Sequence, residues 1–212
     1  MKNTEHANPS NVNHSDEGLR FRWGHVNINV ANLDRSIAFY EMLGFEMFLP
    51  DIPYLALNRD EPATEITTTA ASALELPAGL SGRGCIMQLV GDASPKIDLT
   101  EFGTDDDLGN RVTPLGNSDL GLVRLCLLSR DVAAAYATLT SQGVEFISAP
   151  MPGENGMVTL ATCKDPDGTL IELLEIHHER WPDGNGEGVR EVKLPQADDG
   201  ETADFGSKNW VW

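Results

Sequence analysis

Basic residues are scarce in this sequence: 15 Lys and Arg stand against 33 Asp and Glu, giving a formal net charge of −18 over 212 residues. Nucleic acids and anionic membrane surfaces bind proteins through clustered Lys and Arg. The composition therefore argues against both as partners. A cationic ligand would suit the charge, although acidity is also a common source of solubility.

Cysteine and long apolar runs are also lacking. The three cysteines are an odd number and all lie in predicted strands, so we expect buried thiols in a reducing compartment rather than a disulfide framework. No apolar run is long enough to cross a bilayer, and residues 1–20 lack the apolar core of a signal peptide. These features predict a cytoplasmic protein that does not insert into membranes.

Histidine is limited to five positions, of which only His25 lies in a predicted strand; the others are His6, His14, His177 and His178. An iron site built from two histidines and one carboxylate would have to recruit a histidine from outside the predicted sheets. We therefore do not expect oxygenase chemistry.

A strand followed by a capped helix opens the patterned part of the chain. Residues 25–30 alternate polar and apolar side chains, which is typical of a strand. Apolar residues then recur at helical spacing after Asn32, a suitable N-cap, and Gly44 follows where a helix should end. The polar face of the strand carries His25, Asn27 and Asn29.

The same pattern occurs a second time, 99 positions later, with the pairs Leu33 and Val132, Gly44 and Gly143, and Phe45 and Val144. The closing segments 96–102 and 170–176 repeat at the shorter spacing of 74. The difference indicates an insertion in the first unit, at residues 50–83. We expect a helix over 63–76 within it, and we expect the insertion to cover one end of a cavity as a lid.

The chain therefore divides into five parts: a polar N-terminal tail (1–20), a first module (21–102) with its insertion (50–83), a linker (103–120), a second module (121–178) and an acidic C-terminal tail (179–212). The second module should contain a strand at 144–148 after its helix. Trp210 and Trp212 suggest that the tail docks on this chain or on a partner subunit, which leaves a homodimer open.

The repeated unit, opened by GHVNINVANLDRSIAFYEMLGF and closed by DPDGTLIELLEI, resembles the vicinal oxygen chelate superfamily of glyoxalases, bleomycin resistance proteins and extradiol dioxygenases. The resemblance covers residues 21–178. It implies an α+β fold of two tandem βαβββ modules that form a U-shaped, eight-stranded cleft with the helices outside.

The resemblance also implies a divalent metal held by four positions, which here are His25, Asp98, Arg124 and Glu172. Arg124 departs from that pattern, because a guanidinium is always protonated and has no lone pair to give a metal. We therefore favour a site without a metal or other cofactor. If a metal binds, the ligands would be His25, Asp98 and Glu172.

Without a metal, the four residues form a charge-balanced set. His25 is then a candidate general base or acid, and Arg124 a candidate for stabilising a substrate oxyanion. Asp98 and Glu172 complete the catalytic set, although a purely structural ion-pair network is an open alternative. Asn27, Asn29 and Cys126 are candidate substrate-binding residues. Cys126 shares the face of Arg124, as core filler or as a thiol activated by the cation.

These residues favour a lyase or isomerase that abstracts a proton from a small carbonyl or carboxylated substrate, with hydrolase or dehalogenase chemistry open on the same residues. One alternative is a binding protein that sequesters a drug without changing it. Another is a metal-dependent enzyme similar to glyoxalase or epimerase, with Arg124 bound to the substrate.

Overall fold

The computed structural model describes residues 23–92, 95–103, 115–153, 156–177 and 180. The predicted N-terminal tail, most of the linker and nearly all of the C-terminal tail, including Trp210 and Trp212, lie outside these residues. A homodimer held by that tail therefore stays a prediction. Within the described part of the chain, no helix is long and apolar enough to span a bilayer.

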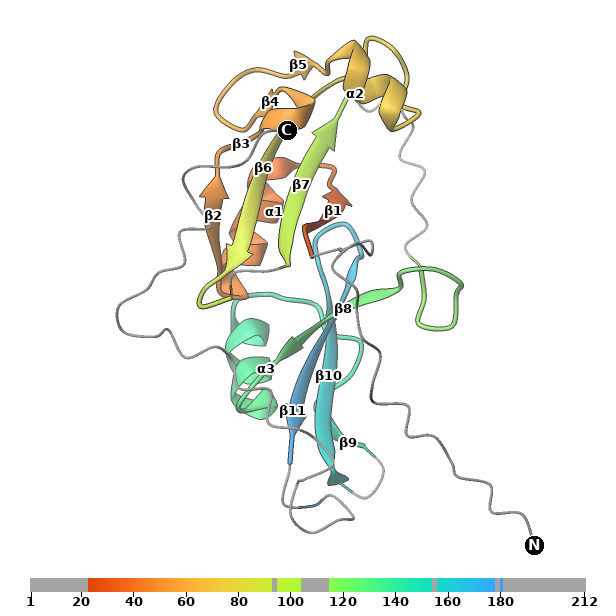
Figure 1. The fold of residues 1–212 in the computed structure, drawn as a ribbon. Helices are drawn as coiled ribbons and strands as arrows, with labels where there is room; N and C mark the ends of the chain where they lie inside the picture. The colour runs from red at the N-terminus through yellow and green to blue at the C-terminus, as the bar shows by residue number, and fades with distance from the viewer. Residues whose placement is uncertain (1–22, 93–94, 104–114, 154–155, 178–179, 181–212) are drawn as a thin grey trace, which may run out of the picture.

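The first module is a five-stranded sheet with one helix against it (Figure 1). Its strand order is β1-β7-β6-β2, with β5 also paired to β6; β1 runs parallel to β7, and the other pairs are antiparallel. The elements of the module core are β1 (His25–Asn29), α1 (Leu33–Met42), β2 (Phe45–Leu49), β6 (Ser81–Leu89) and β7 (Lys96–Phe102).

The second module is a four-stranded sheet of order β8-β11-β10-β9. Its elements are β8 (Arg124–Leu128), α3 (Val132–Ser141), β9 (Met151–Pro152), β10 (Val158–Lys164) and β11 (Leu170–Ile176). The predicted strand at 144–148 is wrong. Two backbone hydrogen bonds, from Ile147 N to Thr162 O and from Lys164 N to Glu145 O, tie this segment to β10, but it forms only one isolated bridge.

The two modules repeat each other in strand register. Asn27 lies opposite Asp98 in the first sheet, and Cys126 lies opposite Glu172 in the second, as the two sequence spacings require. The closing strand also caps the helix in both modules. The Leu33 N–H donates to Glu101 at 2.6 Å, and the Val132 N–H donates to Glu175 at 3.0 Å. The strand register and the helix capping therefore repeat between the two halves of the chain.

The helix ends follow the predicted signals. The Asn32 side chain accepts from Arg35 N at 2.9 Å, which satisfies one of the free N–H groups of the first turn of α1. Asp131 does the same for α3, accepting from Ala134 N at 2.8 Å. Gly44 and Gly143, which follow the helices, both have φ of 90°, a conformation that favours glycine.

The insertion has a small core of its own at one end of the first sheet (Figure 1). The predicted helix over 63–76 is shorter, because Thr67 caps it by accepting from Ala70 N at 3.2 Å. The elements are β3 (Asp51–Ile52), the 3-10 helix η1 (Pro53–Leu55), β4 (Leu57–Asn58), β5 (Thr64–Glu65) and α2 (Thr68–Ala73). A lid function stays a prediction.

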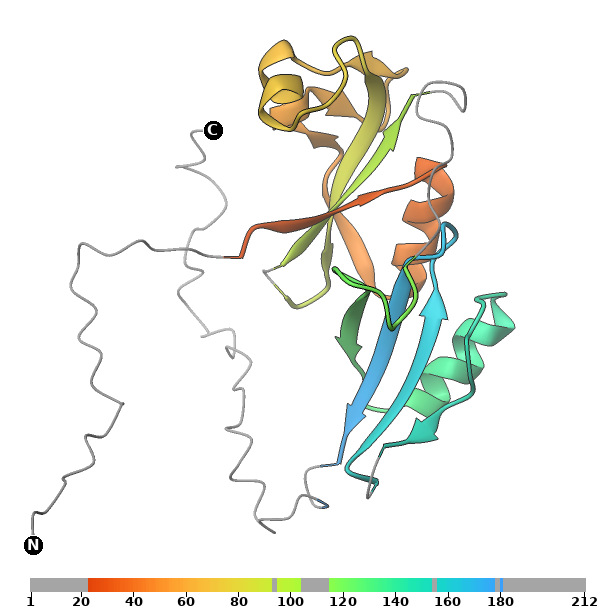
Figure 2. The same cartoon turned by 90° about the vertical axis from the view of Figure 1, so that its right-hand side faces the viewer.

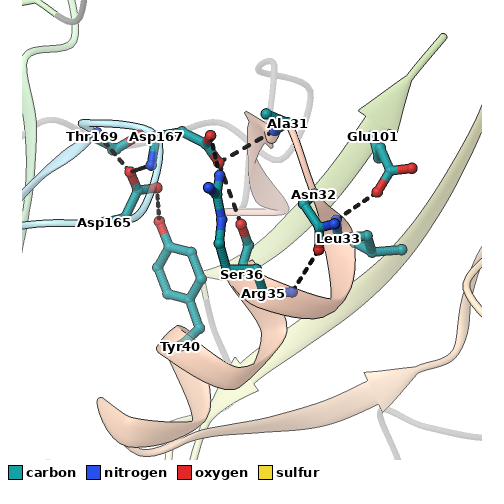
Figure 3. A network of polar contacts seen from close by, with 10 residues as sticks. All are labelled: Ala31, Asn32, Leu33, Arg35, Ser36, Tyr40, Glu101, Asp165, Asp167 and Thr169. Atoms are coloured by element: carbon teal, nitrogen blue, oxygen red, sulfur yellow. Dashed lines mark hydrogen bonds and ion pairs between the residues drawn. The ribbon is translucent and has the colours of Figure 1, made fainter. Parts of the chain in front are cut away.

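The two modules meet where α1 contacts the turn before β11 (Figure 3). The buried Tyr40 hydroxyl donates to Asp165 at 3.1 Å, and Arg35 pairs with Asp167 at 2.5 Å. One hydrophobic core runs through both modules, from Tyr40 to Cys163. The fold is thus a single packed body rather than two separate modules.

The helices α1 and α3 lie on one side of the two sheets, as expected (Figure 2). The α+β class is confirmed. The arrangement of eight strands around one U-shaped cleft is not confirmed, because within the described residues no strand pairing joins the two sheets.

Candidate active site

His25 contacts a tyrosine and a carboxylate at the edge of the first sheet. The Tyr54 hydroxyl donates to Asp98 Oδ2 at 2.9 Å and lies 3.3 Å from His25 Nε2. The Tyr54 and His25 rings stack, with centroids 5.6 Å apart and planes inclined by 16°. The direct distance from His25 Nε2 to Asp98 Oδ2 is 3.6 Å. We call His25, Tyr54 and Asp98 the histidine cluster.

Asp98 is the fully buried member of this cluster, whereas the His25 side chain is 37% exposed. Burial raises the pKa of the Asp98 carboxyl, and the neighbouring His25 and the Tyr54 hydrogen bond oppose that rise. Its buried Oδ1 atom has no hydrogen-bond partner among the described residues. Burial and the Asp98 charge also raise the pKa of Tyr54, so the hydroxyl keeps its hydrogen.

The predicted binding residues Asn27 and Asn29 are exposed and linked to the same sheet face. Asn27 donates to Asn29 at 2.8 Å and accepts from the buried Thr100 hydroxyl at 2.9 Å. These bonds fix the Asn27 amide on β1, the strand that also carries His25, against the neighbouring β7. The structure therefore places an ordered polar row along β1, and substrate binding by it stays a prediction.

Arg124 is fixed on the second sheet by two partners. Its Nε donates to Glu172, and its Nη1 donates to Asn117 Oδ1 at 3.0 Å. The Arg124 side chain is 40% exposed, and the Glu172 side chain is 14% exposed. Among the described residues, no hydrogen bond occupies Nη2. A guanidinium held in this way keeps one edge available for an anion.

Cys126 departs from the predicted picture of three buried thiols. Cys85 and Cys163 are buried, but Cys126 is exposed. It is not an activated thiol either. Partial burial and the Glu172 charge raise the pKa of Cys126, and the opposing effect of Arg124 does not reverse this. The earlier expectation of core filler is also wrong, since the side chain lies on the open face of β8.

The predicted set of four is divided between the two sheets. Contacts join His25 to Asp98 and Arg124 to Glu172, and none of the described contacts joins one pair to the other. The two pairs occupy corresponding positions of the repeat, and their grouping into one site came from the family resemblance.

The donor set does not fit a divalent metal. Within the described residues, no group of three or more His, Cys, Asp or Glu is placed to hold one. Glu172 is neutralised by Arg124, and the Tyr54 hydroxyl occupies Asp98 Oδ2. Catalytic metal sites of this kind usually take three protein ligands, and the histidine cluster supplies two.

Two contributors to the site are absent from the sequence prediction. Tyr54 lies in the insertion, which has no repeat partner, and Asn117 lies in the segment assigned as linker. Neither lies in the part of the chain that repeats between the two units. The only available signal for Tyr54 was the buried-strand pattern on either side of Pro53, which indicates a compact fold for the insertion.

A separate groove of about 460 Å³ lies between α1 and the second module. Phe39 and Met42 line one side of it, and Gln142 and Lys164 line the other. None of the residues of the histidine cluster borders this groove, so it is distinct from the candidate site.

Comparisons with known proteins agree with this fold. The model of the glyoxalase/bleomycin resistance protein/dioxygenase superfamily matches residues 22–173. A probable lactoylglutathione lyase from Synechocystis is 26% identical over 158 residues, covering 74% of this chain and 96% of that protein.

One solved structure supports the fold. A glyoxalase family protein from Bacillus cereus superposes with a TM-score of 0.59 at 21% identity, covering 76% of this chain and 98% of that one. A superfamily member from Sphaerobacter thermophilus covers 74% of this chain and 98% of its own, at 22% identity and a TM-score of 0.47. With the family match over most of the chain, the protein belongs to the glyoxalase/bleomycin resistance protein/dioxygenase superfamily.

Proposed function

We propose that this protein is a small-molecule lyase or isomerase that removes a proton from a carbon next to a carbonyl group. One observation carries the proposal: a partly exposed imidazole, His25, stands beside a fully buried carboxylate, Asp98. A histidine paired with a buried acid is a common general base. The name of the Synechocystis relative supports lactoylglutathione, a 2-hydroxyacyl thioester, as the first substrate to test.

In the proposed step, the C–H bond next to the carbonyl breaks and its proton passes to the neutral imidazole of His25. The electron pair of that bond moves into the carbonyl group and leaves an enolate oxygen. The proton then returns to carbon, at the same or the neighbouring position, which regenerates the neutral imidazole. No oxidant or reductant is consumed. Asp98 stabilises the imidazolium that exists between the two transfers.

Arg124 is the proposed partner of the enolate oxygen or of a substrate carboxylate. Glu172 and Asn117 hold its guanidinium, so the side chain does not have to be ordered when substrate binds. An oxyanion donor of this kind contributes about 10²- to 10³-fold in rate. A substrate with a carboxylate remote from its acidic C–H can reach both sheets, whereas contact with the enolate oxygen, which is two bonds from that carbon, requires Arg124 to approach His25.

Metal independence is part of the proposal. It is supported by the occupied carboxylates, because Arg124 neutralises Glu172 and the Tyr54 hydroxyl takes up Oδ2 of Asp98. No step above passes through a metal.

The test uses proton NMR to measure how fast the full chain exchanges the C2 hydrogen of lactoylglutathione for deuterium in heavy water. Pyruvate and dihydroxyacetone serve as further carbonyl probes. His25→Gln should slow exchange by about 10²- to 10⁴-fold, and Arg124→Gln by about 10²-fold. Each variant should keep the melting temperature of the unaltered protein.

Two control variants match these substitutions in residue type. His177→Gln removes a histidine at the far end of β11, and Arg130→Gln removes an exposed arginine after β8. Both should exchange at the normal rate. Stoichiometric binding of a probe without any exchange would overturn the proposal in favour of a sequestering protein, and no exchange with any of the three probes would also contradict it.

A further inference from the structure

We propose that Tyr54, supplied by the insertion, is a positioning residue that fixes the tautomer of His25, with the hydrogen on Nε2 and the lone pair on Nδ1. The catalytic part of this inference, that Nδ1 is the atom that takes the substrate proton, rests on the proposed function. The tautomer itself does not depend on any activity.

The direction of the Tyr54 hydrogen bond is the first step. The hydroxyl lies 2.9 Å from Asp98 Oδ2, and an ionised carboxylate can only accept. Burial raises the pKa of this carboxyl, and the nearby His25 and the Tyr54 hydrogen bond oppose that rise, so the carboxylate is the form that applies at the alkaline pH of the test below. The single hydroxyl hydrogen of Tyr54 is therefore committed to Asp98.

The second step follows from that commitment. The Tyr54 oxygen also lies 3.3 Å from His25 Nε2, and with its hydrogen used it can only accept there. Nε2 must then carry the hydrogen of the neutral ring. Asp98 cannot fix the tautomer directly, because its Oδ2 is 3.6 Å from Nε2, which is beyond hydrogen-bond distance. Tyr54 thus transmits the position of the buried carboxylate to the imidazole.

The third step concerns the other ring nitrogen. When Nε2 bears the hydrogen, Nδ1 carries the lone pair. Among the described residues, nothing forms a hydrogen bond with Nδ1, and the His25 side chain is 37% exposed. The stacked Tyr54 ring, inclined by only 16°, restricts rotation of the imidazole. Nδ1 is therefore the basic atom offered to a substrate.

The packing of the insertion explains why Tyr54 can do this. Its neighbours Ile52 and Leu55 are buried at 0% and 2% exposure in the small core of the insertion. The backbone at Tyr54 is thus anchored on both sides. The second module has no such segment, since the corresponding interval is the short stretch 149–156, and there Arg124 replaces the histidine. The insertion and the histidine therefore occur together in the same module.

The experiment records two-bond ¹H–¹⁵N correlations of the histidine rings in the ¹⁵N-labelled full chain, at alkaline pH where imidazoles are neutral. The His25 signals are identified by their loss in His25→Gln. The unaltered protein should give the pattern of an Nε2–H ring. Tyr54→Phe keeps the stacked ring and the packing but removes the hydroxyl, so its His25 signals should shift toward a mixture of both tautomers.

Tyr40→Phe is the matched control, because it also removes a hydroxyl that donates to a buried aspartate but does not contact His25. Its His25 signals should stay unchanged. An Nδ1–H ring in the unaltered protein, or the same tautomer in Tyr54→Phe, would overturn the inference.

The exchange assay separates this inference from the proposed function. Tyr54→Phe should lower kcat for exchange about 10-fold and leave KM within about 2-fold, since it acts on His25 and not on substrate binding. If the tautomer is as expected but no probe exchanges, the proposed function fails and the positioning role stands. If exchange occurs and Tyr54→Phe matches the unaltered protein in kcat and tautomer, the positioning role fails alone.

Discussion

The hydrogen bond from Tyr40 to Asp165 should be the strongest single polar contact between the two modules. Tyr40 is fully buried, and Asp165 is 4% exposed. Asp165 also accepts the backbone N–H groups of Asp167 at 2.9 Å and Thr169 at 2.7 Å, so its carboxylate is fixed in the turn before β11. Tyr40→Phe leaves the packing in place but removes the Tyr40 hydroxyl, which among the described residues is the only side-chain donor to Asp165 Oδ2.

The expected cost follows from the burial. A hydrogen bond to a charged, buried partner contributes about 1.5–3 kcal/mol, because its loss leaves the buried Oδ2 atom of Asp165 without its donor, while Oδ1 keeps its two backbone donors. The ion pair between Arg35 and Asp167 offers a contrast: the Arg35 side chain is 49% exposed, so solvent screens the pair. Arg35→Gln should cost about 0.5 kcal/mol or less.

Urea unfolding, followed by circular dichroism at neutral pH, measures both costs from the shift in midpoint at constant slope. Tyr40→Phe should lose at least three times the free energy of unfolding that Arg35→Gln loses. Equal losses in the two variants, or a loss below about 0.5 kcal/mol in Tyr40→Phe, would refute the reasoning that burial decides the strength of these contacts.

Two further predictions concern individual side chains. Limited alkylation with iodoacetamide should label Cys126 before Cys85, because Cys126 is exposed whereas burial raises the pKa of the Cys85 thiol to about 12. Mass spectrometry of the labelled peptides gives the order of labelling, and equal labelling of the two thiols would contradict this prediction. Asp98→Asn should gain stability relative to the unaltered protein as pH rises above about 4. The pKa of Asp98 is raised in the folded state from its ordinary 3.8, so between these two pKa values the folded state holds a proton that the unfolded state has lost. Over that pH range the free energy of unfolding of the unaltered protein falls as pH rises, whereas Asp98→Asn has no such dependence. Urea midpoints at several pH values check this, and a pH-independent difference would refute it.

The repeated parts of the fold were predictable because local signals and the long-range arrangement agree. Asn32 and Asp131 cap helices, and glycine follows each helix in the conformation that glycine favours. The two sequence spacings place Asp98 opposite Asn27 and Glu172 opposite Cys126, as observed.

Other features depend on contacts that no local pattern encodes. The segment 144–148 has the alternation of a strand but lacks a continuous partner, so it pairs at one bridge only. Tyr54 belongs to an insertion without a repeat partner, so its approach to His25 follows from packing of Ile52 and Leu55. Cys126 was predicted as buried from strand position alone, yet its strand β8 lies at the edge of its sheet with one face open.

The grouping of four charged residues into one cluster illustrates the same point. Equivalent positions in a repeat occupy equivalent places in each module, but their distance depends on how the modules dock. Here docking is set by α1 and the turn at Asp165 and Asp167. Strand register therefore predicted each pair, and it did not predict the relation between the pairs.

The central claim is that His25 transfers a proton without help from a metal. The most direct test is deuterium exchange at C2 of lactoylglutathione by protein treated with a chelator and desalted, with elemental analysis of the same sample. The account predicts that this metal-free protein exchanges at the full rate, and that adding Mn, Co, Ni or Zn does not raise it. Exchange that appears only after a metal is added would contradict the claim and assign the chemistry to a metal site.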